Sequence, residues 1–445
     1  MEKTESKRIS REGKALVGIF VFAALAAMVF SFLGPVNFLL LSSGIAVMTA
    51  VLLKPFYGLC FLAVSIPYAG ILQIAPKLTA NKAFAVWVVL SFLLGLLVRK
   101  ENLKLFSSFT LRFYIVLHVY LFVSFPFRTV TQENLESLFS KIFLLGLVFL
   151  IAAIPVNFRE FRIICLVSAA GSALLGIYIA LFGMEKVVGE YGTRLAAGTN
   201  ENVLAHALGV GLLLSFFAMK DADRKIKGAI LFLDVFSVYA ILLTGSRGTW
   251  LALVLSVALF PLFAPGIPLK KRLQYILSGI LTVGIISGGL IYGLFGQWGQ
   301  LVMDRLVEHD TMAQAAGGRV SNIWPFYLGK FSEKPFFGWG PGASEYLGMS
   351  AHNDFLWSLV EMGGVGFILL LLFLAFALKE ILANRDTTLR LQALILFTFL
   401  LLAGLTHNTL SLKSYALAWG ALCFLAKLSV KQEIQPRPTP ARIQS

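Results

Sequence analysis

The sequence predicts an all-α polytopic membrane protein with about 12–14 transmembrane helices and one large helical loop on the outer side. Of its 445 residues, 58% are hydrophobic and only 14% are charged, whereas a soluble domain is nearer a quarter charged. Apolar runs of roughly 16 to 24 residues recur along the chain, and each is long enough to cross about 30 Å of hydrocarbon. Inside a bilayer every backbone polar group must be paired within its own segment, so we expect these runs to be helices.

The candidate spans follow one another closely from the N-terminus. A basic stretch, Lys7 to Lys14, precedes the first apolar run without a small-residue cleavage site, which favours a retained first helix. The third run contains Pro67 and the last two runs are short, so twelve to fourteen spans remain open, and either even number keeps both termini on one side. The fourteen runs begin near Ala15, Val36, Phe56, Ala83, Leu111, Ile142, Ile163, Asn202, Gly228, Gly248, Leu273, Phe355, Leu389 and Leu410.

The net charge of +15 has a distribution that predicts topology rather than nucleic-acid binding. Most Lys and Arg residues lie in the two tails or in alternate loops, which is the bias of cytoplasmic segments in membrane proteins. We therefore expect both termini in the cytoplasm and no nucleic-acid partner. The three cysteines, Cys60, Cys165 and Cys423, lie inside apolar runs without metal-binding spacing and are interpreted as small core residues.

One outer loop is much longer and more polar than the others. It runs from Gly296 to Ala351 and contains many aromatic residues, so we expect a folded cap rather than disorder. Within it, Gln300–Ala316 and Ser321–Ser332 have the periodicity of amphipathic helices. The predicted organisation is a cytoplasmic tail (1–14), a transmembrane domain (15–295), the large loop (296–354), C-terminal transmembrane helices (355–427) and a disordered cytoplasmic tail (428–445).

His352 is the first candidate for chemistry, at the junction of this loop with the next span. A histidine at the membrane surface titrates near neutral pH and can accept a proton from a hydroxyl. Asp354 or Glu361 could orient it, although Glu361 lies half a turn out of phase unless the helix is broken. An interfacial histidine paired with the backbone, followed by the polar pair Asn353 and Asp354, is the alternative interpretation.

Arginines on the same side form the second group of candidates. Ser246 and Arg247 sit between two spans with almost no loop, where an arginine is costly unless it is paired, snorkels or lines a wet cavity. Arg319 lies in the large loop ahead of Trp324. Arg194 precedes a span that begins at Asn202, one turn before His206, which is more simply read as a packing histidine. Three arginines near a histidine favour a polyanionic ligand, because guanidinium groups bind phosphate oxygens in pairs.

Metal and nucleotide sites are not indicated by the pattern of residues. No HxxxH, HExxH or DxD pair occurs on the predicted outer face, and His309, His352 and His407 are scattered. No Walker motif and no GxGxxG in a strand–helix context are present. We therefore predict no cofactor, no metal and no nucleotide.

Three segments in order then make the chain resemble the O-antigen ligase/polymerase superfamily of bacterial inner-membrane glycosyltransferases. The segments are Thr244–Trp250, Gly318-Arg319 through Trp324 to Pro335–Gly340, and His352-Asn353 through Glu361–Gly366. The resemblance covers about Arg194 to Gly366, and the first half of the chain matches only in hydropathy.

The resemblance implies metal-independent, inverting transfer of a glycan (O-antigen) from undecaprenyl diphosphate to a hydroxyl of lipid A-core on the periplasmic face. By the same resemblance, His352 is the base, Arg247 and Arg319 bind the leaving diphosphate, and Arg194 contacts phosphate or sugar. Further substrate contacts are expected from Asn202, Ser246, Trp324, Asn353 and Asp354. The expected partners are the lipid-linked donor, the lipid A-core acceptor and membrane lipids of the bacterial inner membrane.

Two alternatives stay open at this stage. A polymerase of the same superfamily would use a second lipid-linked repeat as the acceptor, although a single long periplasmic loop is more typical of ligases. A polysaccharide or lipid transporter would instead need charges distributed through the membrane, for which Asp234 is the main candidate.

Overall fold

The structure is a computed structural model that describes most of the chain from residue 44 to residue 434. The described residues are 44, 47–69, 71, 73–75, 78–99, 108–125, 132–155, 157–187, 193–196, 200–259, 268–274, 277 and 319–434. The span predicted from Ala15, the first part of the one from Val36, most of the one from Leu273, the helix Gln300–Ala316, the N-terminal tail and the end of the C-terminal tail lie outside these residues.

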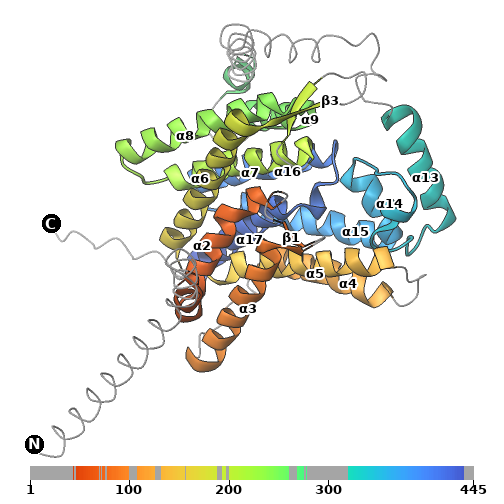
Figure 1. The fold of residues 1–445 in the computed structure, drawn as a ribbon, viewed down its shortest axis with the longest axis horizontal. Helices are drawn as coiled ribbons and strands as arrows, with labels where there is room; N and C mark the ends of the chain where they lie inside the picture. The colour runs from red at the N-terminus through yellow and green to blue at the C-terminus, as the bar shows by residue number, and fades with distance from the viewer. Residues whose placement is uncertain are drawn as a thin grey trace, which may run out of the picture.

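Helices account for nearly all of the described secondary structure (Figure 1). In chain order the elements are α2 (Pro55–Ser65), η1 (Ile66–Tyr68), β1 (Gln73–Ala75), β2 (Leu78–Thr79), α3 (Ala80–Arg99), α4 (Phe109–Ser124), α5 (Gln132–Ala153), α6 (Phe158–Phe182), β3 (Met184–Val187), β4 (Thr193–Ala196), α7 (Glu201–Met219), α8 (Arg224–Leu243), α9 (Arg247–Ala258), η6 (Arg319–Ile323), α13 (Trp324–Glu333), α14 (Ala343–Tyr346), α15 (Asp354–Leu382), α16 (Thr387–Gly404), η7 (Thr409–Ser411) and α17 (Lys413–Ile434).

Six of the described helices are long and apolar enough to cross a membrane: α5, α6, α7, α8, α15 and α16. Four shorter apolar helices lie in Pro55–Tyr68, Phe84–Leu97, Phe109–Ser124 and Arg247–Ala258. Large apolar side chains also point outward from the long helices; Leu181 and Phe232 are 69% and 65% exposed. Such a surface suits hydrocarbon rather than water, and the predicted class, an all-α polytopic membrane protein, is confirmed.

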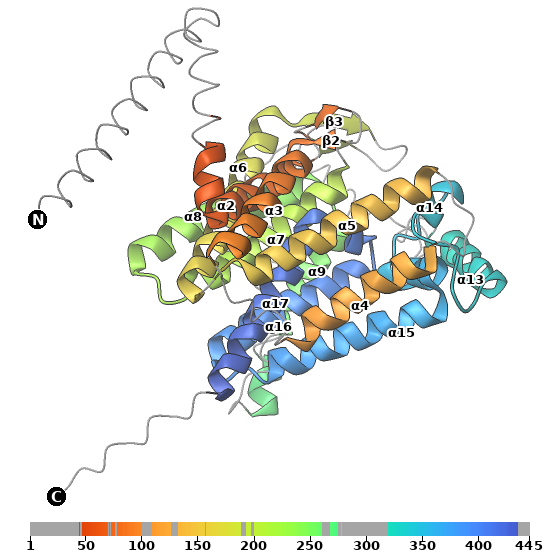
Figure 2. The same cartoon turned by 90° about the horizontal axis from the view of Figure 1, so that it is seen from below.

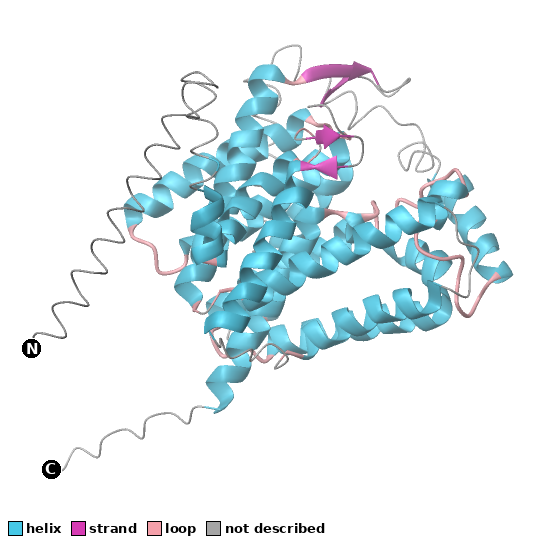
Figure 3. Ribbon diagram, turned by 60° about the horizontal axis from the view of Figure 1, so that its bottom comes forward, coloured by secondary structure: helices cyan, strands magenta, loops and turns pink. Residues whose placement is uncertain are grey.

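Two short antiparallel hairpins, β1–β2 and β3–β4, are the strands in the described part of the chain (Figure 3). The sequence analysis did not predict them. In the second hairpin Lys186 lies opposite Arg194, and Val187 lies opposite Thr193. This hairpin lies between α6 and α7. Its backbone groups have no helical partners there, and the two strands pair with each other.

The long helix α15 packs along α4 over much of its length (Figure 2). Phe113 of α4 stacks on Phe376 of α15 with ring centroids 4.4 Å apart. Near the C-terminal end of α15, the Glu380 carboxylate accepts hydrogen bonds from the backbone nitrogens of Phe109 and Thr110. A carboxylate at a helix N-terminus satisfies unpaired N–H groups and interacts favourably with the helix dipole, so α4 and α15 are fixed to each other.

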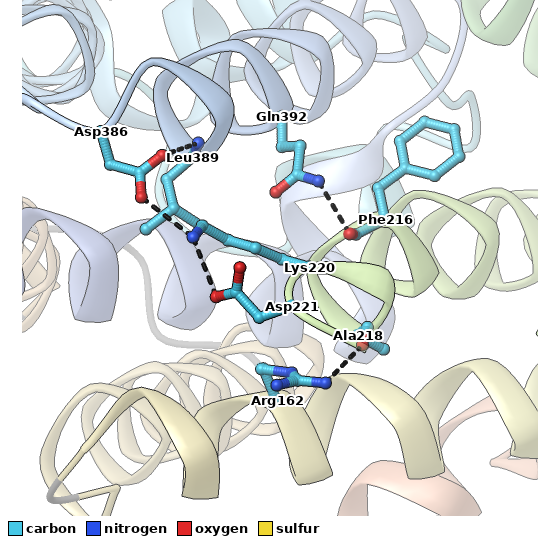
Figure 4. A network of polar contacts seen from close by, with 8 residues as sticks. All are labelled: Arg162, Phe216, Ala218, Lys220, Asp221, Asp386, Leu389 and Gln392. Atoms are coloured by element: carbon cyan, nitrogen blue, oxygen red, sulfur yellow. Dashed lines mark hydrogen bonds and ion pairs between the residues drawn. The ribbon is translucent and has the colours of Figure 1, made fainter. Parts of the chain in front are cut away.

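A polar network joins α6, α7 and α16 at the end of α7 that lies farthest from His206 (Figure 4). Lys220 lies 3.0 Å from both Asp221 and Asp386. Gln392 of α16 donates to the Phe216 carbonyl at 2.8 Å, and Arg162 of α6 donates to the Ala218 carbonyl at 3.3 Å. Helices α7 and α16 are therefore held together at this end, and the candidate site lies near their other ends.

The described part of the large loop has its own small apolar cluster. Tyr327 of α13 and Ala343 of α14 are buried with Trp357 and Val360 of α15. The Tyr327 hydroxyl donates to the Met349 carbonyl at 2.6 Å. As a result α13 and α14 lie against the start of α15 at one end of the helix bundle (Figures 1 and 2).

Helix α15 is interrupted at Gly363, where φ is 67° and ψ is −173°. The segment Pro335–Gly340, which we call the inserted segment, lies against this break. Trp339 and Gly340 donate to the carbonyls of Val360 and Glu361 at 2.7 and 2.9 Å, and the nitrogen of Gly364 donates to the Pro335 carbonyl at 2.7 Å. The inserted segment thus satisfies backbone groups that the broken helix leaves unpaired.

Candidate active site

His352 lies in the turn before α15 in a backbone conformation that is uncommon for a side chain with a Cβ. Its φ is 48°, and Asp221 is the other described non-glycine residue with positive φ. Such a conformation costs on the order of 1–3 kcal/mol and persists where the surrounding structure holds it in place. The next residue, Asn353, provides that hold: its Oδ1 caps α15 by accepting from Phe355 N at 2.9 Å and Leu356 N at 3.1 Å.

A second loop, between α16 and α17, fixes this turn from the other side. Asn408 Oδ1 accepts from the Asn353 backbone nitrogen at 3.0 Å, and Asn408 Nδ2 donates to Ser350 Oγ at 3.0 Å. Asp354 accepts from the Thr409 hydroxyl and, at 3.1 Å, from Leu410 N. Asp354 therefore ties the two loops together, and the described contacts direct its carboxylate to the second loop.

Asn353→Ala is expected to lower the free energy of unfolding by about 1 kcal/mol, because the first turn of α15 loses its capping oxygen. The measurement is the midpoint of thermal unfolding of purified protein in one detergent at one scan rate. Asn353→Ser keeps an oxygen at the cap and is expected to retain most of the stability. An alanine variant that unfolds at the wild-type temperature would show that the cap contributes nothing.

Three histidine rings stack in a row at this end of the bundle. The ring of His407, in the loop after α16, lies 5.7 Å from that of His352 and 5.1 Å from that of His206 in α7, centroid to centroid. The interplanar angles are 22° and 17°. The Nδ1 atoms of His352 and His407 are buried and have no hydrogen-bond partner among the described residues. Two ring nitrogens at the centre of the site therefore have no hydrogen-bond partner among the described residues.

His206 connects this row to the start of α9. Its Nδ1 lies 3.2 Å from Thr249 Oγ1 and 3.1 Å from the Tyr415 hydroxyl. Thr249 Oγ1 in turn lies 3.0 Å from Ser246 Oγ, at the N-cap of α9. Ser246, one of the predicted substrate contacts, is therefore joined to the row of histidines by a chain of hydroxyl groups.

Arg319 and Arg247 both neighbour the loop after α16. Arg319 Nη1 donates to the Thr406 carbonyl at 3.0 Å. Arg247 is the first residue of α9, and a Cβ on the next residue, Gly248, would lie only 2.6 Å from Thr406 Oγ1. Both arginines, which lie 72 positions apart in the sequence, thus belong to segments that touch the residue beside His407.

The electrostatics of the site keep His352 and His407 neutral. Burial, with the positive charge of Arg319 as a second cause, lowers the pKa of His352 to about 4. Burial, together with His352 and Arg319, likewise lowers the pKa of His407 to about 4. At neutral pH both rings are therefore uncharged and carry a nitrogen lone pair that can accept a proton.

The other predicted site residues lie farther out or elsewhere. Trp324 is the first residue of α13, and its Nε1 is buried without a hydrogen-bond partner among the described residues. Asn202 lies in the first turn of α7, where its backbone nitrogen donates to Asn200 Oδ1. Arg194 is in β4; its side chain lies outside the described atoms, so its predicted approach to the site stays a prediction.

Glu361 takes part in the break of α15 rather than in an ion pair with His352. Its Oε1 accepts from the Gly342 backbone nitrogen at 2.7 Å, and its carbonyl accepts from Gly340. The helix is interrupted two residues later, at Gly363. The break that the sequence analysis considered is present, and it directs the Glu361 carboxylate to the loop that follows the inserted segment.

His407 and Tyr415 are the residues that sequence reasoning missed. His407 was treated as one of several scattered outward histidines, and Tyr415 belongs to an apolar run. Their one local signal is the polar tripeptide Thr406–Asn408 between two apolar spans. Among the described residues, no group of three or more His, Cys, Asp or Glu side chains is arranged to hold a metal ion.

Comparison with known proteins finds a family model that matches part of the chain. Residues 232–371 match the family model described as O-antigen ligase. This range includes Ser246, Arg247, Arg319 and His352 but ends before His407. An uncharacterized protein of Haemophilus influenzae is 26% identical to the chain over 258 residues, which are 52% of this chain and 63% of that protein. The match therefore spans less than two thirds of the length of that relative.

Proposed function

We propose that this protein, whose residues 232–371 match the O-antigen ligase family model, transfers a glycan from undecaprenyl diphosphate to a hydroxyl of lipid A-core on the periplasmic face of the inner membrane. The family supports a lipid-linked glycan and a lipid acceptor in general. One observation carries the residue assignment: His352 Nδ1 is buried beside Arg319 and lacks a hydrogen-bond partner among the described residues. A neutral imidazole in that position suits a general base.

In the proposed step the acceptor oxygen attacks the anomeric carbon of the donor sugar while His352 takes the proton of the hydroxyl. The bond between the anomeric carbon and the diphosphate oxygen breaks, so the configuration at that carbon inverts. Undecaprenyl diphosphate leaves with an added negative charge, which Arg247 and Arg319 stabilise. Arg194 adds a further cation on the donor, and Asn202, Ser246, Trp324, Asn353 and Asp354 position the sugars.

Binding of the donor also raises the pKa of the proposed base, His352. Arg319 is the second cause of the low pKa of His352. A diphosphate beside this arginine cancels much of its charge and so raises the pKa of His352 toward neutrality, where a general base works best. The base therefore becomes stronger when the leaving group is in place.

The orientation in the membrane rests on the two ends of the helices. The candidate site lies at the N-terminal end of α15 and the C-terminal end of α16, whereas Lys379, Arg385 and Arg390 lie near the opposite ends of these helices. Basic residues mark the cytoplasmic side. We therefore place the site on the periplasmic side and both termini in the cytoplasm.

The direct test incubates the purified protein with undecaprenyl-diphosphate glycan, either alone or with lipid A-core. A product that contains lipid A-core and appears only when both are present supports the ligase. A product from the donor alone would identify a polymerase, and no product under either condition would contradict the glycosyltransferase proposal.

The acid limb of the pH profile of kcat/KM is expected to move to higher pH in Arg319→Gln. Loss of the positive charge raises the pKa of His352 from about 4. Because the protonated ring cannot accept a proton, activity begins to fall at a higher pH in the variant than in the wild type as the pH is lowered. The measurement is kcat/KM between pH 4 and pH 8. Arg385→Gln, an exposed arginine away from the site, is the control and should leave the limb unmoved. If the acid limb of Arg319→Gln is not shifted, the charge of Arg319 does not control the pKa of the catalytic base, and the prediction is wrong.

A further inference from the structure

A cavity of about 760 Å³ opens beside the candidate site. Its walls come from α5, α15 and the starts of α3 and α17, and they include Lys82, Lys141, Lys413, Glu136, Glu361 and Trp357. The lining residues do not include His352, Arg247 or Arg319. The cavity is therefore not lined by the residues proposed to act on the donor.

Asn408 connects the cavity to the candidate site. It lines the cavity, and its Oδ1 accepts from the backbone nitrogen of Asn353, the residue after His352. The residue before it, His407, stacks on His352. A ligand in the cavity is thus separated from the proposed base by the Asn353–Asn408 contact.

Lysines outnumber glutamates among the residues that line the cavity. Three lysines line it against two glutamates, and Glu361 already accepts a hydrogen bond from Gly342. Lys141 is only 5% exposed, its ammonium lies 3.6 Å from the centroid of the Trp357 ring, and the carboxylates of Glu361 and Asp354 attract it. A buried ammonium in a membrane helix is costly and marks a functional position. Lys141 and Lys413 therefore present ammonium groups at the walls of the cavity that can contact a bound anion.

The remaining polar lining consists of groups that bind hydroxyls. Lys413 Nζ donates to Thr79 Oγ1 at 2.7 Å at one wall. Phe139 and Phe143 supply apolar surface. The other polar side chains are Ser137, Ser140, Ser344, Asn408 and Ser411. Such a mixture of hydroxyls, an amide and aromatic rings, with lysines at its walls, fits a sugar that carries an anionic group.

We infer that this cavity binds an anionic sugar residue of the acceptor, one that bears a phosphate or a carboxylate. The inference rests on the proposed function, because that function assigns the arginines to the donor diphosphate and assigns no cationic group to the acceptor. A charged sugar anchored by Lys141 and Lys413 holds the acceptor glycan beside the Asn353–Asn408 contact, from where its hydroxyl reaches His352.

The test measures binding without turnover, by titration calorimetry on the full-length protein in phosphatidylcholine nanodiscs. The probes are glucose 6-phosphate, glucuronate, glucose and inorganic phosphate. We expect the two anionic sugars to bind at least about tenfold more tightly than glucose or phosphate. Lys413→Gln and Lys141→Gln should each weaken them by about 10-fold to 100-fold, because each removes a charge-assisted hydrogen bond. Lys379→Gln, at the far end of α15, is the matched control.

Lys413→Arg tests whether the loss of binding in Lys413→Gln comes from a folding defect. The arginine variant keeps the positive charge, so it should still bind the anionic sugars. Binding of glucose as tight as that of glucose 6-phosphate would overturn the inference. A loss of anionic-sugar affinity in Lys379→Gln as large as that in Lys413→Gln would also overturn it. Nanodiscs with phosphatidylglycerol provide a further arm: if this lipid competes with the sugar phosphate, the cavity takes a lipid headgroup and the inference fails.

Kinetics separate this inference from the proposed function. In the transfer reaction, Lys413→Gln should raise KM for lipid A-core about tenfold or more and leave KM for the donor unchanged. Charge-dependent sugar binding without any transfer would contradict the proposed function alone. Transfer with sugar binding that is insensitive to both lysines would contradict the cavity assignment alone.

Discussion

His352→Ala is expected to lower kcat by about 10²-fold to 10⁴-fold, the contribution of a positioned general base. The physical reason is that its buried Nδ1 is the proposed acceptor for the hydroxyl proton, and burial beside Arg319 keeps that nitrogen unprotonated at neutral pH. The measurement is the steady-state rate of transfer from undecaprenyl-diphosphate glycan to lipid A-core at saturating donor and acceptor. Binding of the donor should change much less, because the arginines remain.

His352→Asn is the matched variant for this experiment. Position 352 has a φ of 48°, which asparagine adopts more readily than alanine. The asparagine variant therefore tests the loss of the imidazole without added backbone strain, and it should be as inactive as the alanine variant. If either protein is folded and retains more than a tenth of the wild-type kcat, His352 is not the base.

Gly363→Ala is expected to destabilise the protein by about 2–5 kcal/mol. A Cβ at this position would lie 2.3 Å from the Phe336 carbonyl oxygen, and the residue has a φ of 67°. Overpacking against the backbone costs about 1–3 kcal/mol and a left-handed residue with a side chain about 1–2 kcal/mol more. The measurement is the yield of monodisperse protein and its unfolding midpoint in detergent.

Gly146→Ala is the control for this substitution. Gly146 lies in α5, and a Cβ there would have nothing within 4 Å. Alanine favours a helix by up to about 1 kcal/mol over glycine, so this variant should be as stable as the wild type or more so. Equal stability of the two alanine variants would show that the inserted segment yields to the added methyl group.

The fold class could be predicted from the sequence because hydrocarbon imposes helices of a minimum length on any apolar run. The break at Gly363 could not, since it depends on the backbone of Pro335–Gly340, more than twenty residues away. The short hairpins were missed for a related reason: β3 and β4 are four residues each and depend on pairing with each other.

The candidate site was only partly accessible to sequence reasoning. His352, Arg247 and Arg319 each stand out locally, because charged or titratable side chains at the edge of a span are costly. His407 does not, because its importance comes from stacking between rings that belong to different elements, 55 and 201 positions away. The assignments of roles to these residues remain predictions for the experiments above.

The contact between Gly338 and Gly363 has an evolutionary and practical consequence. A Cβ on Gly338 would lie 2.5 Å from Gly363 N, and one on Gly363 would lie 2.5 Å from Gly338 N. The inserted segment and the break in α15 are thus one structural unit. A substitution at Gly338 or Gly363 requires a compensating change in the other segment. Chimaeras between relatives should exchange residues 335–366 as a single block, since a crossover inside it would join halves that never adapted to each other.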